Sequence, residues 1–69
     1  SLNNASFAYQ SLKGANFDEA SLIGANFSGC RFWSVSFVRT NLRQADFRQS
    51  THREALDFTA ADLFGAKIP

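Results

Sequence analysis

The chain has 69 residues, a net charge of +1, one cysteine and one histidine. A lone cysteine cannot form an internal disulfide, and a lone histidine leaves the usual zinc ligand sets incomplete, so we expect no metal and no cofactor. Seven basic and six acidic side chains leave no excess of either sign, which argues against nucleic acid as a partner. So short a chain buries little apolar surface, and its stability needs another source.

From the N-terminus onward, Leu or Phe occupies every fifth position ten times in succession. These residues are Leu2, Phe7, Leu12, Phe17, Leu22, Phe27, Phe32, Phe37, Leu42 and Phe47. Since about one residue in five is Leu or Phe, chance gives such a run with odds on the order of one in ten million. A step of five distributes side chains around an α-helix and alternates the faces of a strand, so it fits neither. A chain that turns a corner every five residues would point all of them inward.

The residues around each central Leu or Phe, called position i, indicate where the corners lie. Position i+2 holds Asn4 and all four glycines, which are Gly14, Gly24, Gly29 and Gly65. The third residue of a type II turn has positive φ, a conformation that Gly adopts freely and Asn tolerates. Position i−2 is mostly small, which predicts a second inward site with little room. Position i−1 is polar, and we expect it to point outward and bond to nearby backbone.

Four segments carry a resemblance to a known family: Ala15-Asn16-Phe17, Ala25-Asn26-Phe27, Ala45-Asp46-Phe47 and Ala61-Asp62-Leu63. They resemble the pentapeptide-repeat consensus of Ala, then Asp or Asn, then Leu or Phe, then two variable residues. The resemblance implies an all-β fold, a right-handed quadrilateral parallel β-helix with four pentapeptides per coil. Residues 1–69 would form a single domain of about three and a half coils. Because neither end shows a capping segment, we expect the domain to belong to a longer chain or to associate end to end.

Stacking positions twenty apart provides a test of the four-sided coil within the sequence itself. The columns are chemically uniform, with Leu2 over Leu22 and Leu42, and Phe7 over Phe27 and Phe47. Such ladders, together with backbone pairing between coils, would supply the missing stability. The predicted core consists of Leu2, Phe7, Leu12, Phe17, Leu22, Phe27, Phe32, Phe37, Leu42, Phe47, Phe58, Leu63 and Ile68.

The period slips once, because the next centre after Phe47 would be His52 and the pattern resumes one residue late at Phe58. We therefore predict a one-residue insertion within residues 51–55, forming a bulge at one corner. The bulge is either a recognition feature or a harmless insertion. His52 falls in the column of Leu12 and Phe32, and no ligand cluster is expected around it.

Outward positions should carry any function, because the inward ones are committed to packing. The candidate interaction surface consists of Trp33, Val38, Ile23, Phe64 and Arg43. Trp33 falls between Lys13 and Arg53 in its column, so cation–π packing and an interface anchor are alternative explanations for it. The arginines that follow one another in sequence fall on successive sides of the coil, which predicts a belt and not a DNA-binding patch.

The pattern indicates a non-catalytic scaffold that presents a β-helix surface to a protein partner. No serine or cysteine stands with a histidine and an acid as a catalytic triad requires, so we expect no enzyme activity. The alternative comes from the family resemblance: some pentapeptide-repeat proteins bind DNA gyrase by imitating duplex DNA, but near-neutral charge and short length argue against it here. No apolar run is long enough to span a membrane, and the chain is expected to be soluble, with the cytoplasm as its default compartment.

Overall fold

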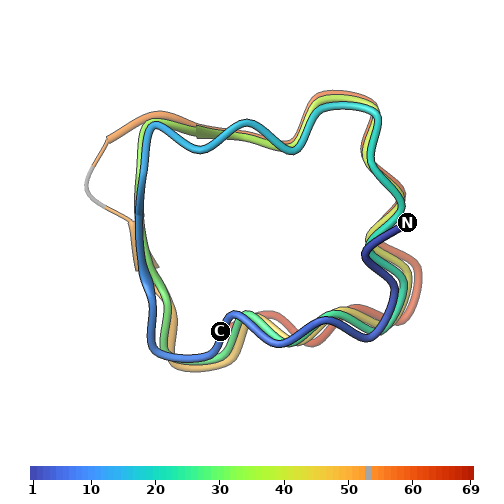
Figure 1. Cartoon of the computed structure of the whole chain (residues 1–69), viewed down its shortest axis with the longest axis horizontal. Coiled ribbons are helices and arrows are strands. Elements are labelled where there is room, and N and C mark those ends of the chain that lie inside the picture. Colours follow the sequence, from blue (N-terminus) through green and yellow to red (C-terminus); the bar gives the residue numbers. More distant parts are fainter. Residues whose placement is uncertain (53) are drawn as a thin grey trace.

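The computed structural model describes residues 1–52 and 54–69, and their backbone follows a four-sided outline when viewed down the shortest axis of the molecule (Figure 1). Successive coils lie over one another in this view, so residues about twenty apart share a side. The described residues form strands, isolated bridges and turns, and they include no helix capable of crossing a membrane. The all-β architecture is therefore a β-helix.

The named strands form two small parallel sheets. Strands β1 (Ser11–Lys13), β2 (Arg31–Trp33) and β4 (Thr51–His52) lie in that order in one sheet, and β3 (Val35–Ser36) pairs with β5 (Leu56–Asp57) in the other. Isolated parallel bridges join the coils elsewhere, as between Ser6 and Asn26 and between Asn26 and Asp46. Hydrogen bonds between coils therefore hold the chain together along its whole described length.

Each side of the coil is named here by the centres that stack on it. Side A holds Leu2, Leu22, Leu42 and Leu63; side B holds Phe7, Phe27, Phe47 and Ile68; side C holds Leu12, Phe32 and His52; side D holds Phe17, Phe37 and Phe58. Sides B and D form aromatic ladders. The rings of Phe7 and Phe27 stack at 5.0 Å and those of Phe27 and Phe47 at 5.1 Å, both nearly parallel. The ladder of side D meets them edge-on, a favourable arrangement of aromatic quadrupoles.

The core lies in the middle coils. Its fully buried members are Leu22, Ala25, Phe27, Cys30, Phe32, Val35, Phe37, Leu42, Ala45 and Phe47, and Phe7, Leu12, Phe17, Phe58 and Leu63 pack against them. Two residues assigned to the core from the sequence are instead exposed, Leu2 at 44% and Ile68 at 59%, because each lies on an end coil with a neighbour on one side only. Val35, at the i−2 position expected to be small, belongs to the core.

The corners use the predicted turn conformation. Gly14, Gly24, Gly29 and Gly65 have φ between 68° and 73°, and every described non-glycine residue with positive φ also stands at i+2. On side B each corner is closed by a turn hydrogen bond, as from the Cys30 N–H to the Phe27 carbonyl at 3.2 Å. The corners after Leu12 and Phe32 on side C lack that bond, so these corners are open.

The pairing register changes on side C after His52. His52 pairs with Phe32, twenty residues earlier, whereas Leu56 pairs with Val35, twenty-one residues earlier. The extra residue therefore lies between His52 and Leu56. Arg53, one candidate for it, lies outside the described residues, and the trace on either side of it leaves the outline that the other coils follow (Figure 1).

Candidate interaction surfaces

An exposed arginine–aromatic pair lies on side A, where outward i+1 residues of successive coils form a column. The Arg43 guanidinium carbon lies 4.7 Å from the centroid of the Phe64 ring, and Arg43 Nη1 lies 3.4 Å from Asp62 Oδ2. Phe64 is 67% exposed although its backbone is fixed, because its N–H donates to Asp62 Oδ1 at 3.1 Å. With half-buried Ile23, these residues form what we call the Arg43–Phe64 face.

Trp33 lies on side C, across the coil from that face. The Lys13 Nζ atom lies 5.1 Å from the centroid of the Trp33 ring, which remains 42% exposed. A cation–π contact accounts for the position of the ring without any partner. The five residues of the predicted surface therefore do not form one patch: Ile23, Arg43 and Phe64 share side A, Trp33 lies on side C and Val38 on side D.

Val38 is half-buried, and the coil before it fixes its backbone. The Asp18 Oδ1 atom accepts hydrogen bonds from the Val38 N–H at 2.9 Å and from the Ser36 hydroxyl. Asn3 does the same for Ile23 and Ser21, at 2.9 and 2.7 Å. Some outward polar residues thus hold neighbouring coils together and are not available for recognition.

The side-chain oxygen at position i−1 accepts a hydrogen bond from a backbone N–H group on its own side, as the sequence predicted. The Asn26 side-chain oxygen accepts from the Ser28 N–H at 2.9 Å, and Asp46 Oδ1 accepts from the Arg48 N–H at 3.0 Å. Arg48 Nη2 also lies 2.8 Å from Asp46 Oδ2. The hydrogen bonds that Asp46 accepts from Arg48 lower its pKa to about 2 from an ordinary 3.8, with a further contribution from the charge of the guanidinium.

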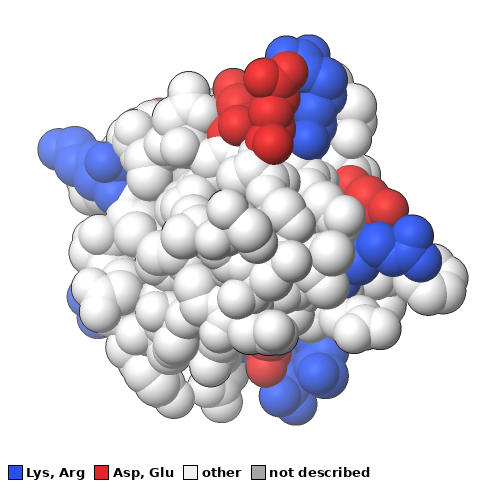
Figure 2. Space-filling view, turned by 45° about the vertical axis from the view of Figure 1, so that its right-hand side comes forward, with Lys and Arg blue, Asp and Glu red and all other residues white. Residues whose placement is uncertain are grey.

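At several places on the face shown in Figure 2 opposite charges lie next to each other, while basic groups at its left edge have no acidic neighbour, and wide uncharged areas separate the groups. Among the described residues, the ion pairs are Arg39 with Glu19 at 3.2 Å, Arg43 with Asp62 and Arg48 with Asp46. Such pairs neutralise each other locally. These three pairs, within the part of the chain that the structure describes, form neither the basic patch that binds a phosphate backbone nor the acidic stripe that would imitate one.

The two residues with the most reactive side chains do not form a chemical site. Cys30 is fully buried, its thiol lies 2.9 Å from the Phe7 carbonyl oxygen that accepts its hydrogen bond, and burial raises its pKa. A protonated, enclosed thiol is a poor nucleophile. His52 is exposed in β4, and the described residues contain no group of three metal-ligating side chains.

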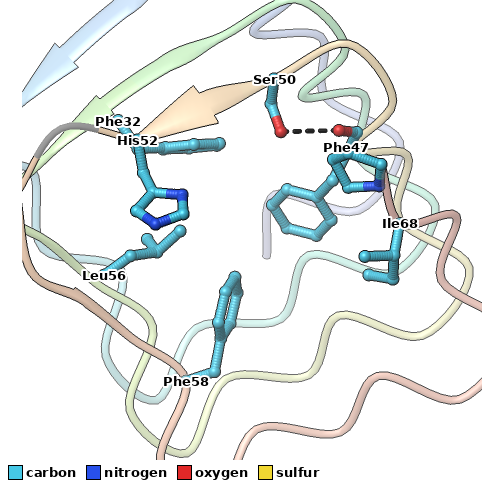
Figure 3. Close-up of a pocket in the computed structure, with 8 residues that line it drawn as sticks. Phe32, Phe47, Ser50, His52, Leu56, Phe58 and Ile68 are labelled. Carbon is cyan, nitrogen blue, oxygen red and sulfur yellow. Dashed lines mark hydrogen bonds between the residues drawn. The ribbon is translucent and has the colours of Figure 1, made fainter.

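An apolar hollow that the sequence did not predict lies beside His52 in the last described coil. It has a volume of about 350 Å³ and is lined mainly by Phe32, Phe47, His52, Leu56, Phe58 and Ile68. In Figure 3, His52 and Leu56 border this space on one side and Phe47 and Ile68 on the other. The signal that could have revealed it is His52 itself, which interrupts a column of apolar centres on side C.

Comparisons with known proteins agree with this geometry. A family model described as pentapeptide repeats matches in eight copies, over residues 1–32 and 26–68. Among solved structures, a pentapeptide repeat protein (Rfr23) from the cyanobacterium Cyanothece 51142 superimposes with a TM-score of 0.61 at 20% identity, over 93% of this chain. The chain spans 40% of the length of that protein. No curated protein matches the sequence.

Proposed function

Because this chain belongs to the pentapeptide-repeat family, we propose that it is a non-catalytic scaffold, a right-handed coil of about three and a half turns that presents its Arg43–Phe64 face to a protein partner. The observation that carries the proposal is the exposure of Phe64, 67%, on a backbone fixed by coil pairing and by Asp62. A large aromatic held in water by a rigid support loses little conformational entropy on binding.

The chemistry of the face fits a protein partner. Arginine and aromatic residues are enriched among the side chains that contribute most to protein–protein affinity. The Arg43 guanidinium is already oriented by the Phe64 ring and by Asp62, and its side chain remains 47% exposed. Ile23 extends the apolar area on the other side of Arg43. A partner would offer an apolar pocket for Phe64 and an acceptor for Arg43.

A capture experiment with matched variants tests the proposal. The immobilised chain is compared with Arg43→Ala, Phe64→Ala and Trp33→Ala, and the retained proteins are identified from lysate of the source organism. We expect the same proteins to disappear with Arg43→Ala and with Phe64→Ala and to remain with Trp33→Ala, whose side chain lies across the coil. Loss with Trp33→Ala alone, or equal retention by all four chains, would overturn the assignment of this face.

A further inference from the structure

We propose that a recess on side B of the coil binds a neutral carbohydrate, with a sugar ring packed against Tyr9 and its hydroxyl groups bonded to Arg48 and Gln49. The recess, which we call the side-B recess, has a volume of about 350 Å³ and is lined by Tyr9, Ser28, Asp46, Arg48 and Gln49. This volume is at the small end of the range for ligand sites. The side-B recess shares no residue with the Arg43–Phe64 face, so either proposal can fail without the other.

The side-B recess forms because small residues of one coil lie between larger residues of its two neighbours. At position i+2, Gly29 lies between Tyr9 and Gln49. The Tyr9 N–H donates to the Ser28 carbonyl at 2.9 Å, and the Gly29 N–H donates to the Arg48 carbonyl at 2.9 Å, so pairing fixes the three coils. The recess therefore lies over the middle one. Any further chain that extended the coil at either end would add coils outside these three.

Tyr9 supplies an aromatic wall for the side-B recess. Its ring packs against Gly29, since a Cβ atom added to Gly29 would lie 2.5 Å from the nearest ring carbon. Only a residue without a side chain leaves room for the ring in this place. One face of a sugar ring consists mainly of C–H groups, and it buries apolar surface when it packs on an aromatic ring. Tyr9 thus provides the apolar part of the site.

The charges at the side-B recess are already paired. Arg48 Nη2 lies 2.8 Å from Asp46 Oδ2, and Arg48 Nε lies 3.1 Å from Asp46 Oδ1. No other Lys, Arg, Asp or Glu side chain lines the recess. A charged ligand would gain little attraction here, because each charge of the pair opposes the effect of the other. The site therefore favours a ligand that is polar and neutral.

Hydrogen-bonding groups remain at the side-B recess beside this ion pair. Within the described chain, Arg48 Nη1, the Gln49 amide and the Tyr9 hydroxyl make no hydrogen bond. Ser28 Oγ donates to Asn26 Oδ1 at 2.7 Å and keeps lone pairs that can accept. The guanidinium only donates, whereas the amide both donates and accepts. A sugar hydroxyl also does both, so a ligand with several neighbouring hydroxyl groups matches this set.

Side A shows which residues shape the recess, because its third coil has nearly the same sequence. Side A reads Asn41-Leu42-Arg43-Gln44 where side B reads Asp46-Phe47-Arg48-Gln49. Ile23 stands on side A where side B has the smaller Ser28. Arg43 reaches the carboxylate of Asp62 in the following coil, whereas Arg48 turns back to a carboxylate of its own coil. A small i+1 residue and a folded-back arginine therefore distinguish side B.

NMR titration of the 15N-labelled chain with the methyl glycosides of glucose, galactose and mannose tests the proposal. We expect at least one glycoside to bind with a dissociation constant on the order of 1 mM, as suits a single ring in a small open site. The largest shifts should be at the amides of Gly29 and Gln49. Tyr9→Ala, which removes the wall, and Ser28→Ile, which fills the recess, should each weaken binding at least about tenfold. Ile23 at the equivalent position indicates that the fold accepts Ser28→Ile.

Matched variants separate the side-B recess from the rest of the surface. Gln49→Ala should weaken binding several-fold, whereas Gln44→Ala, at the same position of side A, should leave it unchanged. Phe64→Ala, which removes the proposed protein-binding face, should also leave glycoside binding unchanged. Tyr9→Ala should in turn still capture any partner of the Arg43–Phe64 face. Circular dichroism of each variant confirms that it is folded.

Three results would contradict the proposal. One is the absence of shifts with all three glycosides up to about 100 mM. Another is binding that Tyr9→Ala and Ser28→Ile leave unchanged, since the sugar would then lie elsewhere. The third concerns adenosine as a competing probe, because a planar base also stacks on an aromatic side chain. If adenosine shifts the same amides and binds more tightly than every glycoside, the ligand class is not a carbohydrate.

Discussion

Sides B and C of the coil run next to each other and are built differently. Side B stacks Phe7, Phe27 and Phe47 in a nearly parallel ladder, and its corners are closed by turn hydrogen bonds. Side C has the longer strand pairing of β1, β2 and β4, but its corners are open and its column ends in His52. The insertion lies on side C after His52, and the equivalent corners after Leu12 and Phe32 have no turn hydrogen bond for an added residue to break. A turn hydrogen bond at a corner favours a spacing of five residues between centres. A corner without that bond can accept an added residue more easily.

The largest expected difference between the two sides concerns their central phenylalanines. Phe27→Ala should lower the free energy of unfolding by about 3–5 kcal/mol, because it leaves a cavity between two stacked rings. Phe32→Ala on side C should cost less, since Phe32 borders the end hollow and its neighbouring rings are tilted or edge-on. Urea unfolding at low protein concentration measures both. Equal losses would mean that ladder stacking contributes nothing beyond burial.

The ladders are the part of this fold that the sequence predicts best, because a period of five places Phe7, Phe27 and Phe47 on one side whatever the details of the corners. Burial at the ends could not be predicted in the same way, since Leu2 and Ile68 satisfy the pattern but have a coil on one side only. Val35 shows the opposite limit: its position was expected to be small, yet the structure accommodates a larger side chain there.

The sequence predicted which single residues point outward, but it did not predict which of them lie together on one surface. The sequence identifies i+1 as outward, and this places Arg43 and Phe64 in one column. The sequence does not reveal that the Asp18 carboxylate accepts a hydrogen bond from the Val38 N–H, because the acceptor comes from a neighbouring coil. The open corners are hidden for a similar reason, since Lys13-Gly14 differs in no obvious way from the i+1 and i+2 pairs that form closed turns.

A smaller expected difference concerns two glycines at corners of these sides. Gly29 follows Phe27 on side B, and a Cβ atom there would lie 2.5 Å from the Tyr9 ring. Gly14 follows Leu12 on side C, and a Cβ atom there would meet no atom within 4 Å. Both have φ near 69°, so Gly14→Ala should cost about 1–2 kcal/mol from backbone strain alone. Gly29→Ala should cost about 1 kcal/mol more, because the Tyr9 ring must move.

A double variant separates strain from contact in this pair. Removing the ring by Tyr9→Ala should reduce the cost of Gly29→Ala to that of Gly14→Ala, as measured by the midpoint of urea unfolding. If Gly29→Ala stays the more costly change in the Tyr9→Ala background, the difference between the corners lies in their turn hydrogen bonds and not in the ring.

The smallest expected difference between sides B and C is in how their stability depends on pH. It concerns the i−1 residue of these two sides in the third coil. That residue is Asp46 on side B and Thr51, which does not ionise, on side C. Because the folded chain holds the pKa of Asp46 at about 2, below its ordinary 3.8, the ionised carboxylate stabilises the fold above about pH 4. This contribution is lost as the pH falls through 2. Arg48 is largely exposed, so the effect should stay below about 1 kcal/mol.

Asp46→Asn tests this assignment with little structural change, because Asn26 occupies the equivalent position one coil earlier and its side-chain oxygen accepts the same type of backbone bond. The variant should be slightly less stable than the parent at neutral pH and equally stable near pH 2, as measured by urea midpoints across that range. The difference between the two curves isolates Asp46 from the other carboxylates, including Asp57, whose pKa is lowered chiefly by the hydrogen bond from the Thr59 hydroxyl. A difference that does not change with pH would mean that the guanidinium of Arg48 does not stabilise the carboxylate of Asp46.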